Sequence, residues 1–305
     1  MAGKGGAGRS SVAAALGICF AARGDNALVV EWTHPEAIAP WFGKPPAGHQ
    51  AIELVPRLWA MNYSLDETLR EYFVGHLGMR LLHDRVIASR HVRRLIHAAP
   101  GIAELLFCGR LFWLAELARD EVGIHYDRIV IDAPATGHGA ALFELPSTLA
   151  AFDLGGLLRL ESTRLARMLA DPERTGAVVV ALPEELAIEE TLELLPRLER
   201  ALGRAPLGVI VNHSVDRFVS GEESPAWLAR LEASRPASSP ALRGVHVELL
   251  GRKARERDLH HALAGAEAPG LGVLSMDEAL LAPEADGARR IVERMARDLD
   301  GWLPR

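Results

Sequence analysis

A glycine-rich segment stands at the start of the chain, directly before an apolar run with helical spacing. Glycines let backbone N–H groups converge on phosphate oxygens, and the N-terminus of a following helix favours negative charge. A hydroxyl just after such a loop can ligate Mg²⁺. We therefore interpret the segment as a phosphate-binding loop for a nucleotide. Its residues are Gly3, Lys4, Gly5, Gly6, Ala7, Gly8, Arg9, Ser10 and Ser11.

Three residues at the end of this loop have distinct predicted roles. Ser10 is expected to ligate the metal, and Ser11 to contact the α-phosphate. Arg9 stands where such loops usually carry lysine. It keeps the positive charge, but its forked guanidinium is not equivalent to a lysine at a tight point-charge contact. The alternative is a glycine-rich turn without a ligand, and residues further along the chain argue against it.

A carboxylate follows a second apolar run, Arg128–Asp132. If that run is a buried parallel strand, Asp132 lies at its C-terminal end, where α/β sheets bind ligands. Beside a phosphate loop, such an aspartate holds the Mg²⁺ shell through water. The alternative is an aspartate that only caps the next turn. The predicted metal site therefore combines Ser10 with Asp132.

The elements that must position these residues are short apolar strands alternating with longer helices, which is typical of a mostly parallel sheet covered on both faces. The predicted strands are Ala27–Glu31, Arg128–Asp132, Ala177–Ala181, Leu207–Val211 and Leu271–Leu274. The predicted helices include Ser11–Arg23, Glu184–Leu202 and an amphipathic Ala288–Leu303, whose mixed charge favours docking on the sheet over binding lipid. The predicted loops are Gly43–Gln50 and Ser220–Arg243.

We expect one domain over residues 1–305, with the three-layer α/β sandwich of P-loop NTPases. Residues 64–119 are apolar at helical spacing and are predicted to form an inserted helical subdomain, which packs on itself or offers a groove to a client helix. Only Met1 and Ala2 precede Gly3, so the first, central strand is expected to be missing. A start upstream of this sequence is the favoured explanation, because losing a central strand exposes the ladder groups of both neighbours.

Composition excludes several classes of protein. A formal charge of −6 argues against a general nucleic-acid binder. The two cysteines, Cys19 and Cys108, lie far apart in apolar surroundings, which indicates buried thiols in a reducing compartment. The sequence has no uncharged apolar run of about eighteen residues that would span a membrane. We therefore predict a cytoplasmic protein.

Lys4 and several downstream motifs resemble those of the ArsA-type ATPases, a family that includes the arsenite-pump ATPase and the targeting ATPase for tail-anchored membrane proteins. The resemblance covers nearly the whole chain. It implies that Lys4 reaches across a dimer interface to the partner's nucleotide. It also implies that Thr136, Gly137 and His138 form a switch that senses the γ-phosphate, and that Asn212 recognises adenine. The matching segments are Leu58–Asn62 with Asp66, Pro100–Ile102 with Glu104, Asp132–His138 with Leu145 and Pro146, and Asn212.

One departure from the family concerns the catalytic base. The family carries Asp-Pro in its first switch, where the aspartate orients or activates water, whereas this chain has His34-Pro35. A neutral His34 can accept a proton, and Glu31 or Glu36 are alternatives. The thiols expected for metalloid binding are absent, so arsenite transport is poorly supported.

The resemblance implies an ATP- and Mg²⁺-binding ATPase that works as a nucleotide-driven dimer, either a homodimer or a heterodimer with a paralogue. It would couple ATP binding and hydrolysis to a hydrophobic client or a membrane partner. Arg9 and His34 leave hydrolysis open, so a hydrolysis-deficient regulatory subunit of a heterodimer is the second hypothesis. A Min/Par-type positioning ATPase is the third, although those proteins lack the helical insertion.

Overall fold

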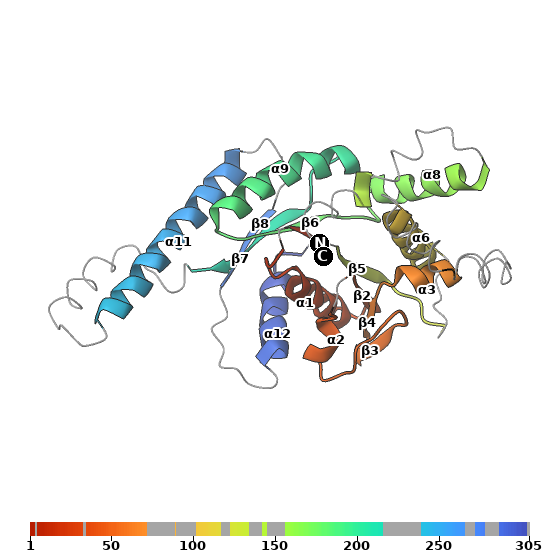
Figure 1. The fold of residues 1–305 in the computed structure, drawn as a ribbon, viewed down its shortest axis with the longest axis horizontal. Coiled ribbons are helices and arrows are strands. Elements are labelled where there is room, and N and C mark those ends of the chain that lie inside the picture. The colour runs from red at the N-terminus through yellow and green to blue at the C-terminus, as the bar shows by residue number, and fades with distance from the viewer. Residues whose placement is uncertain are drawn as a thin grey trace.

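The fold is described from a computed structural model (Figure 1). The described residues are 1–3, 5–32, 35–71, 89, 102–116, 123–133, 142–144, 156–215, 239–265, 272–277 and 287–303.

The strands of the described residues form two four-stranded sheets, in the orders β3-β4-β2-β5 and β1-β6-β7-β8. Neighbouring strands pair in parallel throughout, except for the antiparallel pair β3 and β4. The strands are β1 (Ala2–Gly3), β2 (Ala27–Glu31), β3 (Ile52–Val55), β4 (Leu58–Asn62), β5 (Arg128–Asp132), β6 (Val178–Ala181), β7 (Gly208–Ser214) and β8 (Gly272–Asp277).

The backbone of Met1 joins the two sheets. Its ammonium group donates to the carbonyl of Ile131 on β5 at 2.6 Å, and its own carbonyl accepts from the N–H of Ala133 at 3.3 Å. The next two residues pair with Val179 and Val180 of β6. The prediction that the first strand is missing is therefore wrong, because the structure contains the short strand β1. A two-residue β1 occupies the central position, because even this short backbone stretch satisfies ladder groups of its neighbours.

Helices cover both faces of the sheet, as Figure 1 shows: α1, α2 and α12 lie on one face, and α9 and α11 on the other. The helices α3, α6 and α8 gather at the β2–β4 end of the molecule. This is the predicted three-layer α/β arrangement. The helices are α1 (Arg9–Ala22), α2 (Ile38–Trp41), α3 (Leu65–Arg70), α6 (Ile102–Glu116), α8 (Gly156–Ala170), α9 (Glu185–Leu202), α11 (Ser239–Gly265) and α12 (Gly287–Asp300).

Helix α1 is packed between the sheet and α12. At Gly17 a Cβ atom would lie 2.7 Å from side-chain atoms of both Val29 and Leu58, so the absence of a side chain brings the helix close to β2 and β4. On its other side, the buried apolar positions of α12 meet α1; they are Val292, Met295, Ala296 and Leu299. The predicted amphipathic terminal helix is thus docked, and α1 is its main contact.

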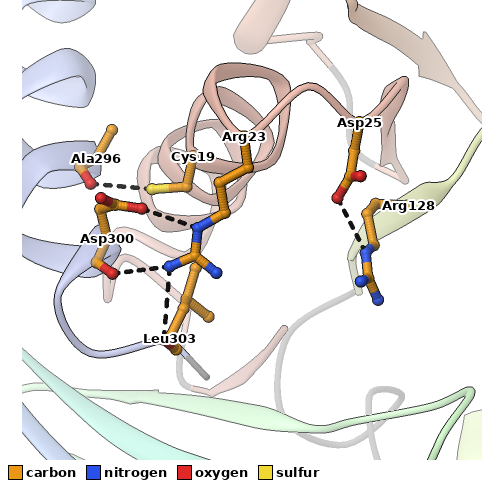
Figure 2. A network of polar contacts seen from close by, with 7 residues as sticks. All are labelled: Cys19, Arg23, Asp25, Arg128, Ala296, Asp300 and Leu303. Atoms are coloured by element: carbon orange, nitrogen blue, oxygen red, sulfur yellow. Dashed lines mark hydrogen bonds and ion pairs between the residues drawn. The ribbon is translucent and has the colours of Figure 1, made fainter. Parts of the chain in front are cut away.

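The far end of α1 is also tied to α12 by polar contacts, which Figure 2 shows. Arg23 donates to the carboxylate of Asp300 at 2.9 Å and to the carbonyl of Asp300 at 2.8 Å. The Cys19 thiol donates to the carbonyl of Ala296 at 2.9 Å. In the loop after the helix, Asp25 pairs with Arg128 at the start of β5, at 3.2 Å.

The predicted strands all occur, with ends that differ by a few residues. Neither β3 nor β4 was predicted from the residues, although the family resemblance covers the segment of β4. The predicted loop Ser220–Arg243 is wrong at its end, because α11 already begins at Ser239; its earlier part lies outside the described residues. Helices α3 and α6 fall in the predicted subdomain 64–119, whose limits stay a prediction. Among the described residues, no helix is long and apolar enough to cross a membrane.

Candidate nucleotide-binding site

The N-terminus of α1 is open. The helix begins at Arg9, after Gly8 in the left-handed conformation at φ 82°, and the N-cap residue Gly8 makes no side-chain capping bond. Its first turn also holds no acidic residue. The first N–H groups of a helix lack partners inside the helix and carry partial positive charge. Because Gly8 supplies no side-chain cap and the first turn itself holds no acidic residue, these N–H groups suit the phosphate oxygens that the sequence predicts for this loop.

Asn212, two residues before β7 ends at Ser214, contacts the phosphate loop. Its Nδ2 donates to the carbonyl of Ala7 at 2.9 Å, and the side chain is buried. A Cβ atom at Gly8 would collide with the same Nδ2 atom, so this contact requires glycine there. The family resemblance assigns Asn212 to adenine. In the structure its amide donor is engaged with the loop, and the role toward adenine stays a prediction.

The predicted metal residues come together. The Ser10 hydroxyl donates to Oδ2 of Asp132 at 2.5 Å, although 122 positions separate the two residues. Asp132 is fully buried, and its Oδ1 atom has no hydrogen-bond partner among the residues that the structure describes. An unpaired buried carboxylate oxygen is costly unless a ligand, a water or an ion completes it. A hydroxyl and a carboxylate are hard oxygen ligands of the kind Mg²⁺ takes together with nucleotide phosphates.

The two residues therefore fit a Mg²⁺ ion and its water shell. Among the described residues, no group of three or more His, Cys, Asp or Glu side chains could hold a metal ion by itself.

Arg9 is turned toward the end of β5, where its Nη1 donates to the carbonyl of Ala133. Burial lowers the pKa of the Arg9 guanidinium from its usual value, and the negative charge of Asp132 opposes this shift. In the usual lysine position of the loop, the structure thus has a guanidinium that is already bonded to the backbone. This contact could not be read from the sequence, because it joins residues far apart in the chain.

Neither alternative base, Glu31 or Glu36, is free. Glu31 ends β2, is fully buried and accepts from the N–H groups of Ala37 at 3.0 Å and Ile38 at 3.2 Å. Glu36 accepts from two backbone N–H groups of the next loop, at residues 47 and 48. Burial raises the pKa of Glu31, while its two backbone hydrogen bonds oppose the shift. Sequence reasoning considered both as bases and missed that they hold the backbone.

Several predicted site residues lie outside the described residues: Lys4, His34, Thr136, Gly137 and His138. Their roles in dimer contact, base catalysis and switching therefore remain predictions. The structure describes and brings together Gly8, Arg9, Ser10, Asp132 and Asn212.

Together, a parallel sheet, an uncapped glycine-preceded helix and a Ser–Asp pair at the ends of α1 and β5 define a P-loop nucleotide-binding protein. The family model of the anion-transporting ATPases (ArsA ATPase) matches residues 1–160 of this chain, which is more than half of it. The chain belongs to this family.

Comparison with known proteins gives relatives of the same kind. The ATPase BagA of Mycobacterium tuberculosis is 29% identical over 234 residues, which cover 72% of this chain and 66% of BagA. The ATPase GET3B of Arabidopsis thaliana is 21% identical over 66% of this chain and 60% of its own length. The arsenical pump-driving ATPase of Escherichia coli is 27% identical over 62% of this chain and 34% of its own length. The matched region thus spans less than the full length of each relative.

Proposed function

We propose that this protein binds ATP with Mg²⁺ at the loop before α1 and hydrolyses it as an ArsA-like ATPase. In this proposal it acts as a nucleotide-driven dimer, with itself or with a paralogue, and couples the nucleotide cycle to a hydrophobic client or a membrane partner. Family membership supports ATP binding and the ATPase class, while the dimer and the client rest on the predicted roles of Lys4 and the helical insertion.

The observation that carries the proposal is the pair Ser10 and Asp132. Their 2.5 Å hydrogen bond supports a Mg²⁺–nucleotide site, as does the Oδ1 atom of this fully buried carboxylate, which has no partner among the described residues. When bound, Mg²⁺ neutralises charge on the β- and γ-phosphates. The open N-terminus of α1 holds the phosphates, and Asp132 orients the metal's water shell.

A second candidate is a subunit that binds ATP with little or no turnover and regulates a complete paralogue. Arg9 favours it, because its guanidinium bonds the Ala133 carbonyl in the position where lysine usually contacts phosphate. The engagement of Glu31 and Glu36 with backbone N–H groups also favours it, since it leaves His34 as the remaining candidate base of the first switch.

The test measures the affinity of the protein for ATP together with its rate of ATP hydrolysis. Fluorescent ATP is titrated with Mg²⁺ and with EDTA, and phosphate release is followed at saturating ATP. We expect binding that depends on Mg²⁺ and is lost in Asp132→Asn, with Asp25→Asn at the far end of α1 as the matched control. Turnover by the wild type would support the first candidate. Tight binding without turnover in the wild type, whether or not turnover appears in Arg9→Lys, would support the second, and absence of ATP binding would refute both.

A further inference from the structure

Strand β7 contains a bulge next to Asn212. The pairing of β7 with β8 shifts by one residue between Val211 and Ser214, so β7 holds one extra residue in this stretch. Within it, His213 has a positive φ of 58°, which is uncommon for a residue other than glycine. Such a conformation persists only where the surrounding structure holds it. Because a bulge re-aims the side chains beside it, this one determines where the Asn212 amide points.

Helix α11 holds the bulge at two points. Nη2 of Arg252 donates to the carbonyl of His213 at 3.0 Å. Oε2 of Glu256 accepts from the N–H of Val215 at 3.2 Å. Because residues four apart lie on the same face of a helix, one face of α11 binds the backbone of β7 on both sides of Ser214. The two contacts stabilise the bulged backbone.

The Glu256 carboxylate is itself held in place. Its side chain is 2% exposed, and its second oxygen, Oε1, accepts from the Ser275 hydroxyl of β8 at 3.2 Å. Oγ of Ser275 also lies 3.0 Å from Nε2 of His260, one turn further along α11. A buried carboxylate is costly unless its oxygens are hydrogen-bonded, and both oxygens of Glu256 are. This carboxylate therefore joins α11 to the carboxyl ends of β7 and β8.

We propose that Glu256 and Arg252 are positioning residues, which hold the bulge of β7 so that the Asn212 amide meets the carbonyl of Ala7 in the phosphate loop. The inference rests on the proposed ATP binding and deepens it, because it makes α11 an element that sets the affinity for the nucleotide. Neither residue has to touch ATP for this role. Their effect on binding passes through Asn212.

The first arm of the experiment tests the contact between Glu256 and Val215 without any ligand. Hydrogen–deuterium exchange is measured at the amide of Val215. We expect protection in the wild type, exchange that is at least about tenfold faster in Glu256→Ala, and a smaller rise in Glu256→Gln, which keeps one acceptor oxygen. Glu248→Gln removes an exposed carboxylate of the same helix and is the matched control, which should leave the exchange unchanged. An unprotected Val215 amide in the wild type would overturn the proposal.

The second arm is a double-mutant cycle of ATP affinity, measured by fluorescent ATP titration with Mg²⁺. We expect about tenfold weaker binding in Glu256→Ala and in Asn212→Ala, and no more than about twofold further loss when the two are combined, because both release the same contact with the loop. Glu256→Gln should recover most of the affinity. A general loss of structure would instead multiply the two effects to about a hundredfold. That result, or unchanged affinity in Glu256→Ala, would overturn the proposal.

A further variant keeps the test decisive if Glu256→Ala does not fold. Arg252→Met removes the donor to the His213 carbonyl and leaves the buried carboxylate paired. It should weaken ATP binding about threefold in the wild type and not at all in Asn212→Ala, with the exposed Arg257→Gln of α11 as its control. An equal loss in both backgrounds would overturn the proposal. If the wild type does not bind ATP, the proposed function fails, and the exchange at Val215 shows by itself whether α11 holds the bulge.

Discussion

At its N-terminal end, α1 has no side-chain cap from Gly8 and faces a carboxylate whose Oδ1 has no partner among the described residues. At its C-terminal end, Arg23, Cys19 and Asp25 are all engaged in polar contacts (Figure 2). The first end leaves polar groups unsatisfied, which is costly in the absence of a ligand. The second end fixes the helix between α12 and β5. We call the N-terminal end of α1 the open end and its C-terminal end, around Cys19, Arg23 and Asp25, the closed end. The contrast indicates that a rigidly held helix presents its open end to the nucleotide.

Gly8→Ala should have the largest effect, because it disturbs the open end directly. The new Cβ would meet Asn212, and φ 82° is strained for alanine. If two phosphate hydrogen bonds are lost, ATP affinity falls by at least about 100-fold, as measured by fluorescent ATP titration. Gly24→Ala is the matched control at the closed end, since its φ is 99° and its Cβ would enter open space. Equal affinity in Gly8→Ala and wild type would refute the described loop geometry.

Asn212→Ala should come next. It leaves the carbonyl of the fully buried Ala7 without its partner. We expect a loss of about 1–3 kcal/mol in the free energy of unfolding, together with roughly tenfold weaker ATP binding as the loop loosens. Denaturant unfolding and nucleotide titration measure the two effects. Asn26→Ala removes the same type of side chain near the closed end, where Asn26 donates to the carbonyl of His125. It should cost stability without weakening ATP, and a loss of affinity there would contradict the comparison.

The contacts at the two ends of α1 differ in how far the sequence predicts them. The spacing of glycines, hydroxyls and a strand-ending aspartate predicts the open end, because the chemistry of phosphate binding restricts residue type. Ser10 and Asp132 accordingly meet as expected. The closed end follows no such rule. Arg23 and Asp300 are 277 positions apart, and many exposed ion pairs of this kind would serve equally well.

Within the site, sequence-based predictions also failed where a contact joins residues that no local pattern connects. Glu31 has the residue type of a general base, but its reach to Ala37 and Ile38 depends on where α2 begins. The two-residue β1 escaped notice because it is shorter than any apolar pattern that sequence reasoning can detect. Long-range geometry decides both cases, and the local sequence does not contain it.

The buried thiol at the closed end predicts a pH dependence of stability. Burial raises the pKa of Cys19 to about 11, from about 9 for an ordinary thiol. Because the folded state holds the proton more tightly, the stabilisation is complete below pH 9 and is lost as pH rises through 11. At pH 10 the wild type should lose about 1 kcal/mol that Cys19→Ala does not lose, relative to pH 7. Urea unfolding at both pH values measures it, and a pH-independent difference between the two proteins would refute the thiol's burial.

The smallest effect is expected for Arg23→Gln, which loosens the closed end. The side chains of Arg23 and Asp300 are 27% and 61% exposed, so solvent screens their ion pair. We expect a loss of about 0.5 kcal/mol in the free energy of unfolding, and less in high salt. ATP affinity should stay within about twofold, because α1 remains packed on the sheet and on α12 through its buried apolar side chains.

The Arg23→Gln variant is the sharpest test of the comparison between the two ends of α1. It shows whether the contacts that hold the helix also affect nucleotide binding. If Arg23→Gln weakened ATP binding more than about fivefold while barely affecting unfolding, the free energy change at the loop would exceed that at the mutated contact. The two ends of α1 would then be coupled, and α12 would belong to the nucleotide-binding machinery. If only stability changes, α12 holds α1 in place and the open end alone determines nucleotide affinity.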